Sequence, residues 1–255
     1  MAESLAGVAL GAGAGTRMLP LTRLRPKVLC PVADEALIDH ALGRLSSVTD
    51  DVAVNVHAPQ HALVRHLDGR AHLSIEHGEA LGTAGGIARL RPWIDGRGVV
   101  VVNGDTWCPG GLEHLVEGWD GSTLRVLVPG DEPFGPRAPV AGALLPWADV
   151  EQLPVSPAGL WEVCWRQALE EGRIETVAHH GPFVDCADPV DYLRANLAAA
   201  GGSVVGAGAQ VEGALEESVV WPGARVRAGE HLRRAIRTDA GTTVLIRRDV
   251  SMRLA

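Results

Sequence analysis

Glycine, arginine and lysine residues gather in one stretch near the beginning of this 255-residue sequence. Residues 8–32 read VALGAGAGTRMLPLTRLRPKVLCPV, with glycines at positions 11, 13 and 15 followed by Arg17 and Lys27. Glycines after a strand let backbone N–H groups approach a ligand, and the arginine and lysine add full positive charges. The spacing is not the Walker form, which needs Gly-Lys-Ser/Thr, and it is not the dinucleotide fingerprint, because position 16 is threonine rather than glycine. The stretch therefore predicts a polyphosphate-binding loop of another kind, although a structural glycine turn remains an alternative.

The elements expected around this loop alternate between strands and helices. Strands are predicted at 5–10, 52–56, 72–76 and 98–102, and helices at 35–45, 60–68 and 83–90. This alternation predicts an α/β fold with a mostly parallel, Rossmann-like sheet and helices on both faces. Ligands of such sheets bind at the carboxyl ends of the strands. Gly11 to Arg17 and Asn103 to Asp105 are therefore expected at a ligand site, because both segments directly follow strands.

Beyond residue 120 the pattern is looser. Strands are predicted at 123–128 and 174–178, a strand and turn in AGALLPWADV, and a helix over 159–171. Asp188, followed by Pro189 and Asp191, is typical of a helix start, with a cap, a proline in the first turn and an early acid. This helix is expected to run to about Ala200 and to stop at Gly201-Gly202.

The sequence changes character at residue 203. Aliphatic residues recur six positions apart among glycines and alanines, as in Val205 and Val211, and in Val220, Val226 and Leu232. This spacing resembles the hexapeptide repeat of a left-handed β-helix, and 203–246 is long enough for about two coils. We expect one domain over 1–202 and a short β-helix-like tail over 203–255. We expect so short a stack to cap the domain or to form a self-association surface of a homo-oligomer. An acyltransferase role for the tail is less expected.

Composition excludes some classes of function. The 23 Lys and Arg residues are outnumbered by 31 Asp and Glu residues, and the net charge of −8 argues against a general nucleic-acid binder. The N-terminus has no secretory signal pattern, and no run of about 18 apolar residues could span a bilayer. We therefore expect a cytoplasmic protein without nucleic-acid or membrane partners.

Cysteines and histidines give no clear metal or redox motif. The four cysteines lie singly and are expected to be buried apolar residues. His179 and His180 are expected as an exposed, solvated pair on a turn.

Lys27 is the single lysine among the 23 basic residues, the other 22 being arginine. An arginine-favouring composition would replace a dispensable lysine, so its survival inside the loop suggests a role that needs a compact ammonium group.

The loop resembles the signature of the sugar-1-phosphate nucleotidylyltransferases, Leu-x-Ala-Gly-x-Gly-Thr-Arg-Met/Leu-x-Pro-Leu-Thr, three variable residues, Pro-Lys, and then Pro-Val. The positions in register are Leu10, Ala12, Gly13, Gly15, Thr16, Arg17, Met18, Pro20, Leu21, Thr22, Pro26, Lys27, Pro31 and Val32. Residues 79–85, 101–105 and 183–193 resemble three further family motifs in the required order. Ala80 replaces a proline in the first of these, and Ala187-Asp188 replaces Gly-Thr in the last. The resemblance covers about residues 5–200.

The resemblance implies an enzyme that joins a nucleoside triphosphate (NTP) to a sugar 1-phosphate, forming an NDP-sugar and pyrophosphate. It implies that Arg17 holds the pyrophosphate, that Lys27 lies between the two reacting phosphates, and that Asp105 and Asp185 hold Mg²⁺. Arg17, Lys27 and Asp105 are the catalytic candidates. Nucleotide binding is expected at Leu10, Gly11, Ala12, Gly13, Gly15, Thr16, Arg17, Glu79, Gly82 and Thr83, and sugar binding at Asn103, Gly142 and Glu162.

Several of these residues have an ordinary structural alternative. Asp105 could cap the turn after its strand, and Asp185 could be a plain loop residue. Thr83 could be a helix N-cap, which is compatible with binding. Glu162 could be an acid at the start of an amphipathic helix, and Gly142 a plain strand residue.

The match also departs from the family pattern. Many relatives carry a second lysine that binds the sugar phosphate, whereas the corresponding stretch DEPFGPRAP offers Arg137 as its cation. The motifs are nearest to mannose-1-phosphate guanylyltransferase, our best guess, and to N-acetylmuramate-1-phosphate uridylyltransferase. One alternative is a regulatory relative that binds nucleotide without turnover. Another is a phosphocholine-type cytidylyltransferase, for which aromatics such as Trp107, Trp147, Trp161 and Trp165 would surround a quaternary amine.

Overall fold

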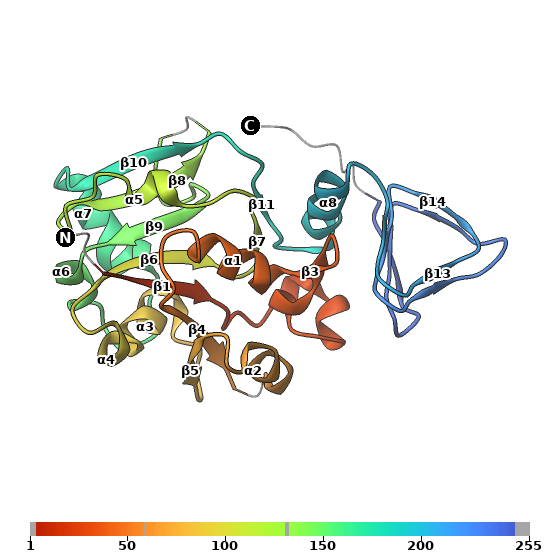
Figure 1. Ribbon diagram of the computed structural model, residues 1–255, viewed down its shortest axis with the longest axis horizontal. Coiled ribbons are helices and arrows are strands. Elements are labelled where there is room, and N and C mark those ends of the chain that lie inside the picture. The colour runs from red at the N-terminus through yellow and green to blue at the C-terminus, as the bar shows by residue number, and fades with distance from the viewer. Residues whose placement is uncertain (1–3, 59, 131–132, 248–255) are drawn as a thin grey trace.

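A seven-stranded α/β sheet forms the centre of the molecule in the computed structural model, which describes residues 4–58, 60–130 and 133–247 (Figure 1). The strand order is β10-β8-β9-β6-β1-β4-β5, and β9 is antiparallel to both β6 and β8. The strands are β1 (Leu5–Leu10), β4 (Val52–His57), β5 (His72–Glu76), β6 (Gly98–Asn103), β8 (Leu124–Pro129), β9 (Gly142–Leu145) and β10 (Ile174–His179). The mostly parallel sheet expected from the sequence is confirmed.

Helices cover both faces of this sheet, as predicted. Alternate residues of β6 point to opposite faces: Val99 and Val101 join one apolar cluster, and Val100 and Val102 join another. Helix residues complete each cluster, including Ile87 in the first. The helices are α1 (Leu37–Leu45), α2 (His61–Leu67), α3 (Gly82–Arg89), α4 (Arg91–Ile94), α5 (Glu113–Val116), α6 (Trp147–Val150), α7 (Arg166–Glu170) and α8 (Pro189–Ala200).

Helix boundaries follow the local sequence closely at α8. The Asp188 carboxylate accepts hydrogen bonds from the N–H groups of Val190 at 2.8 Å and Asp191 at 3.1 Å. The helix ends at Gly201, whose φ of 69° lies in the left-handed region. The helix expected over 159–171 differs, because it begins with a π-helical turn, Trp161–Trp165 (η4), before α7.

Two short strands form a separate two-stranded sheet where the chain leaves β6. Strand β7 (Thr106–Trp107) pairs antiparallel with β11 (Val184–Asp185), and Thr106 lies opposite Asp185. The chain between β1 and α1 contains three 3-10 turns, η1 (Thr16–Met18), η2 (Leu21–Arg23) and η3 (Lys27–Leu29), and a small hairpin of β2 (Pro31–Val32) and β3 (Glu35–Ala36). Both features lie at the carboxyl end of the parallel strands.

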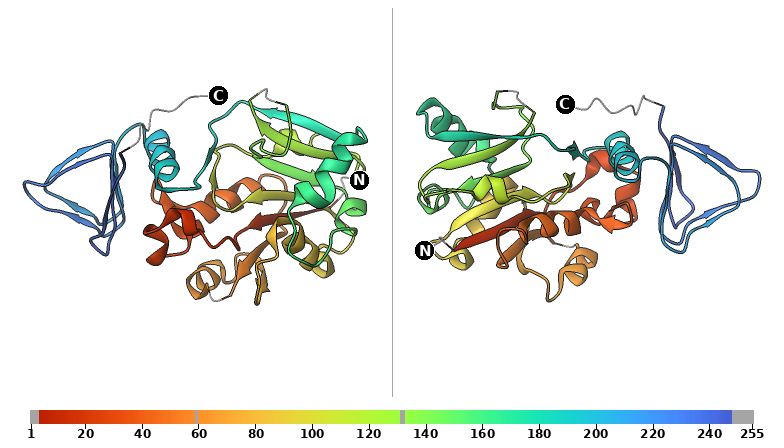
Figure 2. Two further views of the ribbon diagram at one scale, coloured as in Figure 1. Left: turned by 180° about the vertical axis from the view of Figure 1, so that it is seen from behind. Right: turned by 45° about the horizontal axis from the view of Figure 1, so that its top comes forward.

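The C-terminal tail, residues 203–247, forms three columns of short strands that outline a triangle beside α8 (Figures 1 and 2). The columns are β12-β15-β18, β13-β16 and β14-β17, all with parallel pairing, and β19 adds to β18 in the antiparallel sense. Their bounds are β12 (Val204–Val205), β13 (Gln210–Val211), β14 (Ala214–Glu216), β15 (Val219–Val220), β16 (Arg225–Val226), β17 (His231–Arg233), β18 (Ala235–Arg237) and β19 (Thr243–Leu245). Residues 248–255 of the predicted tail lie outside the described residues.

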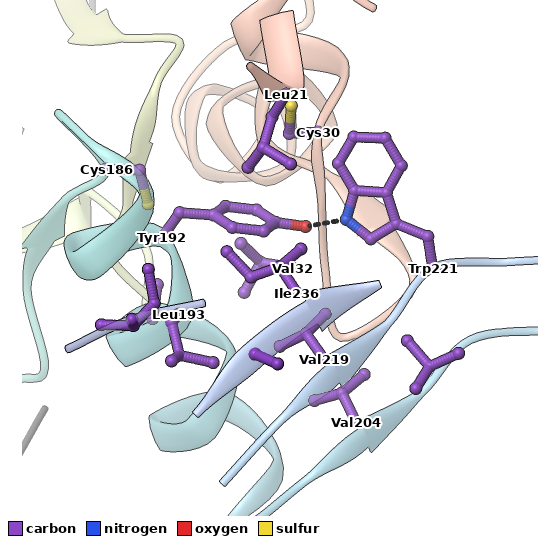
Figure 3. Close-up of a cluster of buried hydrophobic side chains, with 14 of the residues drawn as sticks. Leu21, Cys30, Val32, Cys186, Tyr192, Leu193, Val204, Val219, Trp221 and Ile236 are labelled. Atoms are coloured by element: carbon purple, nitrogen blue, oxygen red, sulfur yellow. Dashed lines mark hydrogen bonds between the residues drawn. The ribbon is translucent and has the colours of Figure 1, made fainter. Parts of the chain in front are cut away.

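A third apolar cluster, the tail cluster, lies between the tail, α8 and residues 16–32 (Figure 3). It contains Met18 and Leu21 from the N-terminal part, Tyr192 from α8 and Trp221 from the tail. The tail therefore buries part of its apolar surface against its own chain.

All four cysteines are buried and free, as expected. Within the described ranges, no helix is both long and apolar enough to cross a membrane.

Candidate active site

Asp105 and Asp185 lie side by side because strand pairing brings their segments together. Asp105 directly precedes β7, and Asp185 ends β11, the partner strand of β7. The backbone N–H of Cys186 also donates to the carbonyl oxygen of Asp105 at 3.2 Å. Gly104 closes the turn after β6, where a Cβ atom would lie 2.8 Å from the Leu10 carbonyl oxygen. A side chain at this position would therefore disturb the turn that aims Asp105.

The Lys27 side chain lies close to both carboxylates. Its Nζ lies 2.5 Å from Oδ2 of Asp105 and 3.9 Å from Oδ1 of Asp185. The Lys27 side chain is 6% exposed. The pKa of Asp185 is raised by burial and by the nearby Asp105 carboxylate, and Lys27 and Arg17 oppose that rise. Two acids and a lysine from three separate segments thus lie close together.

The signature loop, residues 11–32, turns at Gly15, and this turn packs against the Lys27 side chain. The φ of Gly15 is 62°, and a Cβ atom there would lie 2.9 Å from Cβ of Lys27 and 3.0 Å from Cγ2 of Thr22. Thr22 fixes the turn by donating its hydroxyl proton to the Gly15 carbonyl oxygen at 3.0 Å. Arg17 is exposed on η1. Gly15 therefore serves the shape of the loop, whereas a Cβ atom at Gly13 would enter open space.

A cavity of about 200 Å³ lies beside the loop at the ends of β1, β4 and β6. Its lining residues are Leu10, Ala12, Gly13, Asn55, Ala80, Gly82, Thr83, Asn103 and Asp105. Gly82 has a φ of 69°, and a Cβ atom there would lie 2.6 Å from the carbonyl oxygen of Ala158. The Thr83 hydroxyl accepts from the N–H of Leu160 at 2.9 Å, and α3 has no side-chain cap. The helix-cap interpretation of Thr83 is therefore wrong.

Asn55 and Glu76 support this cavity, although neither was predicted from the sequence. Both are buried at the ends of β4 and β5. Asn55 accepts from the N–H of Gly11 at 2.8 Å and donates to Oε1 of Glu76 at 2.8 Å. Oε2 of Glu76 accepts from the N–H of Leu81 at 3.0 Å. The available signal was a polar residue near the end of each apolar strand, in VAVNVH and HLSIE.

A larger cavity of about 470 Å³ adjoins the first and shares Leu10, Thr83 and Asn103 with it. Its polar or charged side chains include Arg137, Glu162 and Asp185, and its aromatic ones are Trp161, Trp165 and Phe183. Asn103, at the end of β6, therefore faces both spaces.

Gly142 and Glu162 both line this larger cavity. Gly142 does so with its backbone, since a Cβ atom there would point at Cδ2 of Leu112, 3.2 Å away. The exposed Glu162 carboxylate turns back toward Gly159 at the first turn of η4. The structure thus brings the predicted sugar-side residues to one space.

The remaining predicted residues lie outside the linings of both cavities. Gly11 is buried beneath the smaller cavity through its bond to Asn55, and Glu79 is exposed on the loop before α3. The others, Gly15, Thr16, Arg17 and Lys27, belong to the signature loop.

The aromatic residues are divided between cavity and core. Trp161 and Trp165 line the larger cavity and pack edge-to-face against Phe134, with ring centroids 5.7 and 5.5 Å apart. Trp107 is buried in the tail cluster, and Trp147 packs against the sheet. The four tryptophans named for the cytidylyltransferase alternative therefore do not surround one space.

The expectation for His179 is wrong. Its side chain is buried at the end of β10, and its Nε2 lies 3.3 Å from the Sγ atom of Cys108. Burial lowers the pKa of His179, because the charged imidazolium loses hydration there. His180 is exposed, as predicted. His179 is the last residue of β10 and His180 lies just beyond it, so the two histidines do not share an environment.

Comparisons with known proteins identify the family. The nucleotidyl transferase family profile matches residues 6–127. An N-acetylmuramate alpha-1-phosphate uridylyltransferase from Caulobacter vibrioides is 31% identical over 225 residues, covering 73% of this chain and 93% of that protein. The chain belongs to the nucleotidyl transferase family. The resemblance found in the motifs is thereby confirmed, and the protein is a nucleotidyltransferase.

Two further similarities of this nucleotidyltransferase are more distant. The bifunctional protein GlmU of Methanocaldococcus jannaschii is 23% identical over 216 residues, which cover 74% of this chain and 53% of that protein. A crystal structure of a putative glucose-1-phosphate thymidylyltransferase from Bacillus anthracis superposes with a TM-score of 0.66 at 18% identity, covering 77% of this chain and 95% of that one. The second match shows a shared fold.

Proposed function

We propose that this nucleotidyltransferase transfers a uridylyl group from UTP to an amino-sugar 1-phosphate such as N-acetylmuramate 1-phosphate. The meeting of Lys27, Asp105 and Asp185 beside two adjoining cavities carries the proposal. The name of the Caulobacter relative, of which the alignment covers 93%, supports this donor and acceptor. Our sequence-based best guess, guanylyl transfer to mannose 1-phosphate, finds no such support among the relatives described above.

In the proposed reaction, a phosphate oxygen of the sugar 1-phosphate attacks the α-phosphorus of the NTP. A new bond forms between that oxygen and the α-phosphorus, the bond from the α-phosphorus to the bridging oxygen breaks, and pyrophosphate leaves with the bond electrons. Such a transfer depends mainly on positioning and on neutralising the phosphate charges. The side chains of this site are suited to those two tasks.

The proposed roles divide between the two cavities. Arg17 binds the departing pyrophosphate, and Lys27 holds the α-phosphate and the sugar phosphate together. The base and ribose occupy the smaller cavity, and the sugar occupies the larger one, where Arg137 is the cation among the lining residues. Nucleotide contacts come from Leu10, Gly11, Ala12, Gly13, Gly15, Thr16, Glu79, Gly82 and Thr83, and sugar contacts from Asn103, Gly142 and Glu162.

Asp105 and Asp185 fit a Mg²⁺ site. Their carboxylates converge on Lys27 Nζ, and burial, followed by the neighbouring Asp105 carboxylate, raises the pKa of Asp185. Mg²⁺ binds through one or two carboxylates together with water and substrate phosphates. Among the residues whose placement is described, no group of three or more His, Cys, Asp or Glu side chains could hold a metal. When bound, the ion would neutralise the triphosphate and polarise the α-phosphorus.

We assign the catalytic domain to residues 1–202 and the tail, as a left-handed β-helix, to residues 203–255. Every proposed site residue lies in the first part, and the parallel columns of short strands support the second. We keep self-association through the tail as a proposal. Sedimentation equilibrium of the whole chain tests it, since a monomer at all concentrations would contradict it.

The test of the proposed function is pyrophosphate release over a matrix of four NTPs and several sugar 1-phosphates with Mg²⁺. We expect the highest kcat/KM for UTP with an N-acetylated amino-sugar 1-phosphate. Highest activity with GTP and mannose 1-phosphate would overturn the donor and acceptor while keeping the reaction. No release with any pair, together with tight NDP-sugar binding, would favour the regulatory alternative.

A second candidate function is cytidylyl transfer to phosphocholine. The observation that favours it is the placement of Trp161 and Trp165 in the larger cavity, because aromatic faces bind quaternary amines. CTP and phosphocholine therefore belong in the same matrix. Release with that pair above every sugar 1-phosphate would establish this candidate instead.

A further inference from the structure

The signature loop rests largely on the C-terminal tail (Figure 3). Val28 packs into a cluster of the central sheet, whereas Met18, Leu21, Cys30 and Val32 belong to the tail cluster. We propose that Trp221 of the tail is a positioning residue for the transfer reaction. It holds the segment around Lys27 in place relative to Asp105 and Asp185. The inference rests on the proposed function, because it assigns Lys27 a place in that reaction.

Tyr192 connects Trp221 with the loop. Trp221 and Tyr192 are both 0% exposed, and the indole Nε1–H donates to the Tyr192 hydroxyl at 2.9 Å (Figure 3). That hydroxyl in turn donates to the carbonyl oxygen of Pro31. Burial raises the pKa of Tyr192 well above its usual value, so the hydroxyl keeps the proton that it donates. A buried relay of this kind permits little displacement, because each lost bond leaves a polar group without a partner.

Arg25 connects Trp221 with the loop on the other side of Lys27. Its guanidinium carbon lies 4.2 Å from the centroid of the Trp221 ring. Its Nη2 pairs with Oδ2 of Asp239, in the turn between β18 and β19, at 3.0 Å. Trp221 therefore contacts Arg25, two residues before Lys27, and reaches Pro31, four residues after it. The segment that bears Lys27 is held at both ends.

Helix α8, which carries Tyr192, follows Asp185 in the chain. It is capped by Asp188, three residues after Asp185. One turn further along, Asn196 accepts from the N–H of Ala33 at 3.2 Å and donates to the Pro31 carbonyl oxygen at 3.3 Å. Helix α8 thus links the carboxylate to the loop, and Trp221 completes the link from the tail.

Two variants test this link. Trp221→Phe keeps an aromatic ring but removes the N–H that bonds to Tyr192, and Arg25→Gln removes both the ring contact and the ion pair. The matched control is Arg233→Gln, because exposed Arg233 pairs with Glu216 inside the tail at 3.0 Å. Leu232→Ala is the stability control, since Leu232 is buried in the tail cluster. Melting temperature is measured for each.

Lys27 itself provides the readout that a merely structural role would not move. It is the single lysine of the chain, so acylation by an amine reagent is read by mass spectrometry on one peptide, separately from the α-amino group. We expect Lys27 to be acylated about fivefold faster in both variants, because a displaced loop exposes Nζ. We also expect kcat to fall about tenfold, with the KM for NTP within about twofold, as for a loss of alignment.

Three outcomes would overturn the inference: unchanged acylation of Lys27 in both variants, a fall in kcat without faster acylation, or an equal effect in Leu232→Ala at the same loss of melting temperature. If Trp221→Phe fails to fold, Arg25→Gln decides alone. The labelling does not depend on turnover. Absence of pyrophosphate release by the wild-type protein would therefore sink the proposed function, while the acylation rates would still decide whether Trp221 positions Lys27.

Discussion

The carboxylates and the cations of the site are held by different parts of the molecule. Asp105 and Asp185 are fixed by backbone pairing between β7 and β11, a two-stranded sheet that follows the carboxyl end of β6. Arg17 and Lys27 lie on 3-10 turns of a loop whose buried side chains pack mostly against α8 and the tail. The carboxylate half thus has strand hydrogen bonds in addition to the packing of Trp107 and Val184 in the tail cluster, whereas the cation half depends mainly on packing with residues almost 200 positions later in the chain.

The two groups of side chains are therefore expected to respond to different substitutions. Backbone pairing uses N–H and C=O groups, so it does not require a particular side chain at each position. A loop that rests on distant side chains moves whenever that packing changes. The variants that follow separate the charge of a group from the support that places it.

The largest expected effect is at Asp105. Asp105→Asn keeps the side-chain shape but removes the charge, so kcat is expected to fall about a thousandfold or more. Circular dichroism is expected to show an unchanged fold, because the strand pairing of β7 does not use this side chain. Asp68→Asn, at an exposed position after α2, is the matched control. If Asp105→Asn kept most of its Mg²⁺-dependent activity, Asp105 would not be a metal ligand.

Lys27→Arg separates charge from shape on the cation side. The guanidinium is larger and planar, and Lys27 sits in a space that leaves it 6% exposed. We expect kcat to fall about a hundredfold despite the retained charge. Steady-state kinetics with saturating NTP measure this. Activity close to wild type would show that a positive charge suffices and that exact support of the loop matters little.

Glu76→Gln tests the support of the smaller cavity. Glu76 accepts from both Asn55 and Leu81, and glutamine has one oxygen for two donors. We expect the free energy of unfolding to fall by about 1–3 kcal/mol and the KM for NTP to rise about tenfold, since Asn55 also holds Gly11. Urea denaturation and kinetics measure the two effects. The exposed control Glu117→Gln should change neither, and an equal effect there would refute the assignment.

The smallest effect concerns pH and His179, whose Nε2 contacts the Sγ atom of Cys108. Burial lowers the pKa of His179 in the folded protein below the ordinary value of 6.5. The folded state therefore binds this proton more weakly than the unfolded state, and stability falls as the pH drops below about 6.5. We expect His179→Asn to lose less stability than the wild type between about pH 7 and pH 5. Parallel pH profiles of the melting temperature would argue against this.

Much of the fold was predictable because its elements follow from patterns of residues that are close together in the sequence. The VVVV run of β6, the Asp188-Pro189 start of α8 and the glycine stop at 201 gave elements that the structure reproduces within a few residues. The motifs likewise placed Asp105 beside a strand end and Lys27 in a loop. His179 was mistaken for a turn residue because its burial depends on β8 and Cys108, which no local pattern reveals.

The support of the site could not be predicted from local patterns. Asn55 and Glu76 are ordinary polar residues until β4 and β5 pair in register and bring them together. In the sequence, Trp221 is one residue of the repeat region. Its contacts with Tyr192 of α8 and Arg25 of the signature loop form only when the tail packs against them. Both cases involve contacts between distant residues, and such contacts carry no periodicity or spacing along the chain.

Residue types at fixed short spacing were enough to predict the family, the mostly parallel sheet and the charged residues of the candidate site. The tertiary structure decided how those charges are held. Lys27 is brought to 2.5 Å from Asp105 by a loop that packs on the tail, and Asp185 joins them through β11. Spacing along a chain can name the groups of a site, but only the packing of remote segments sets the distances between them.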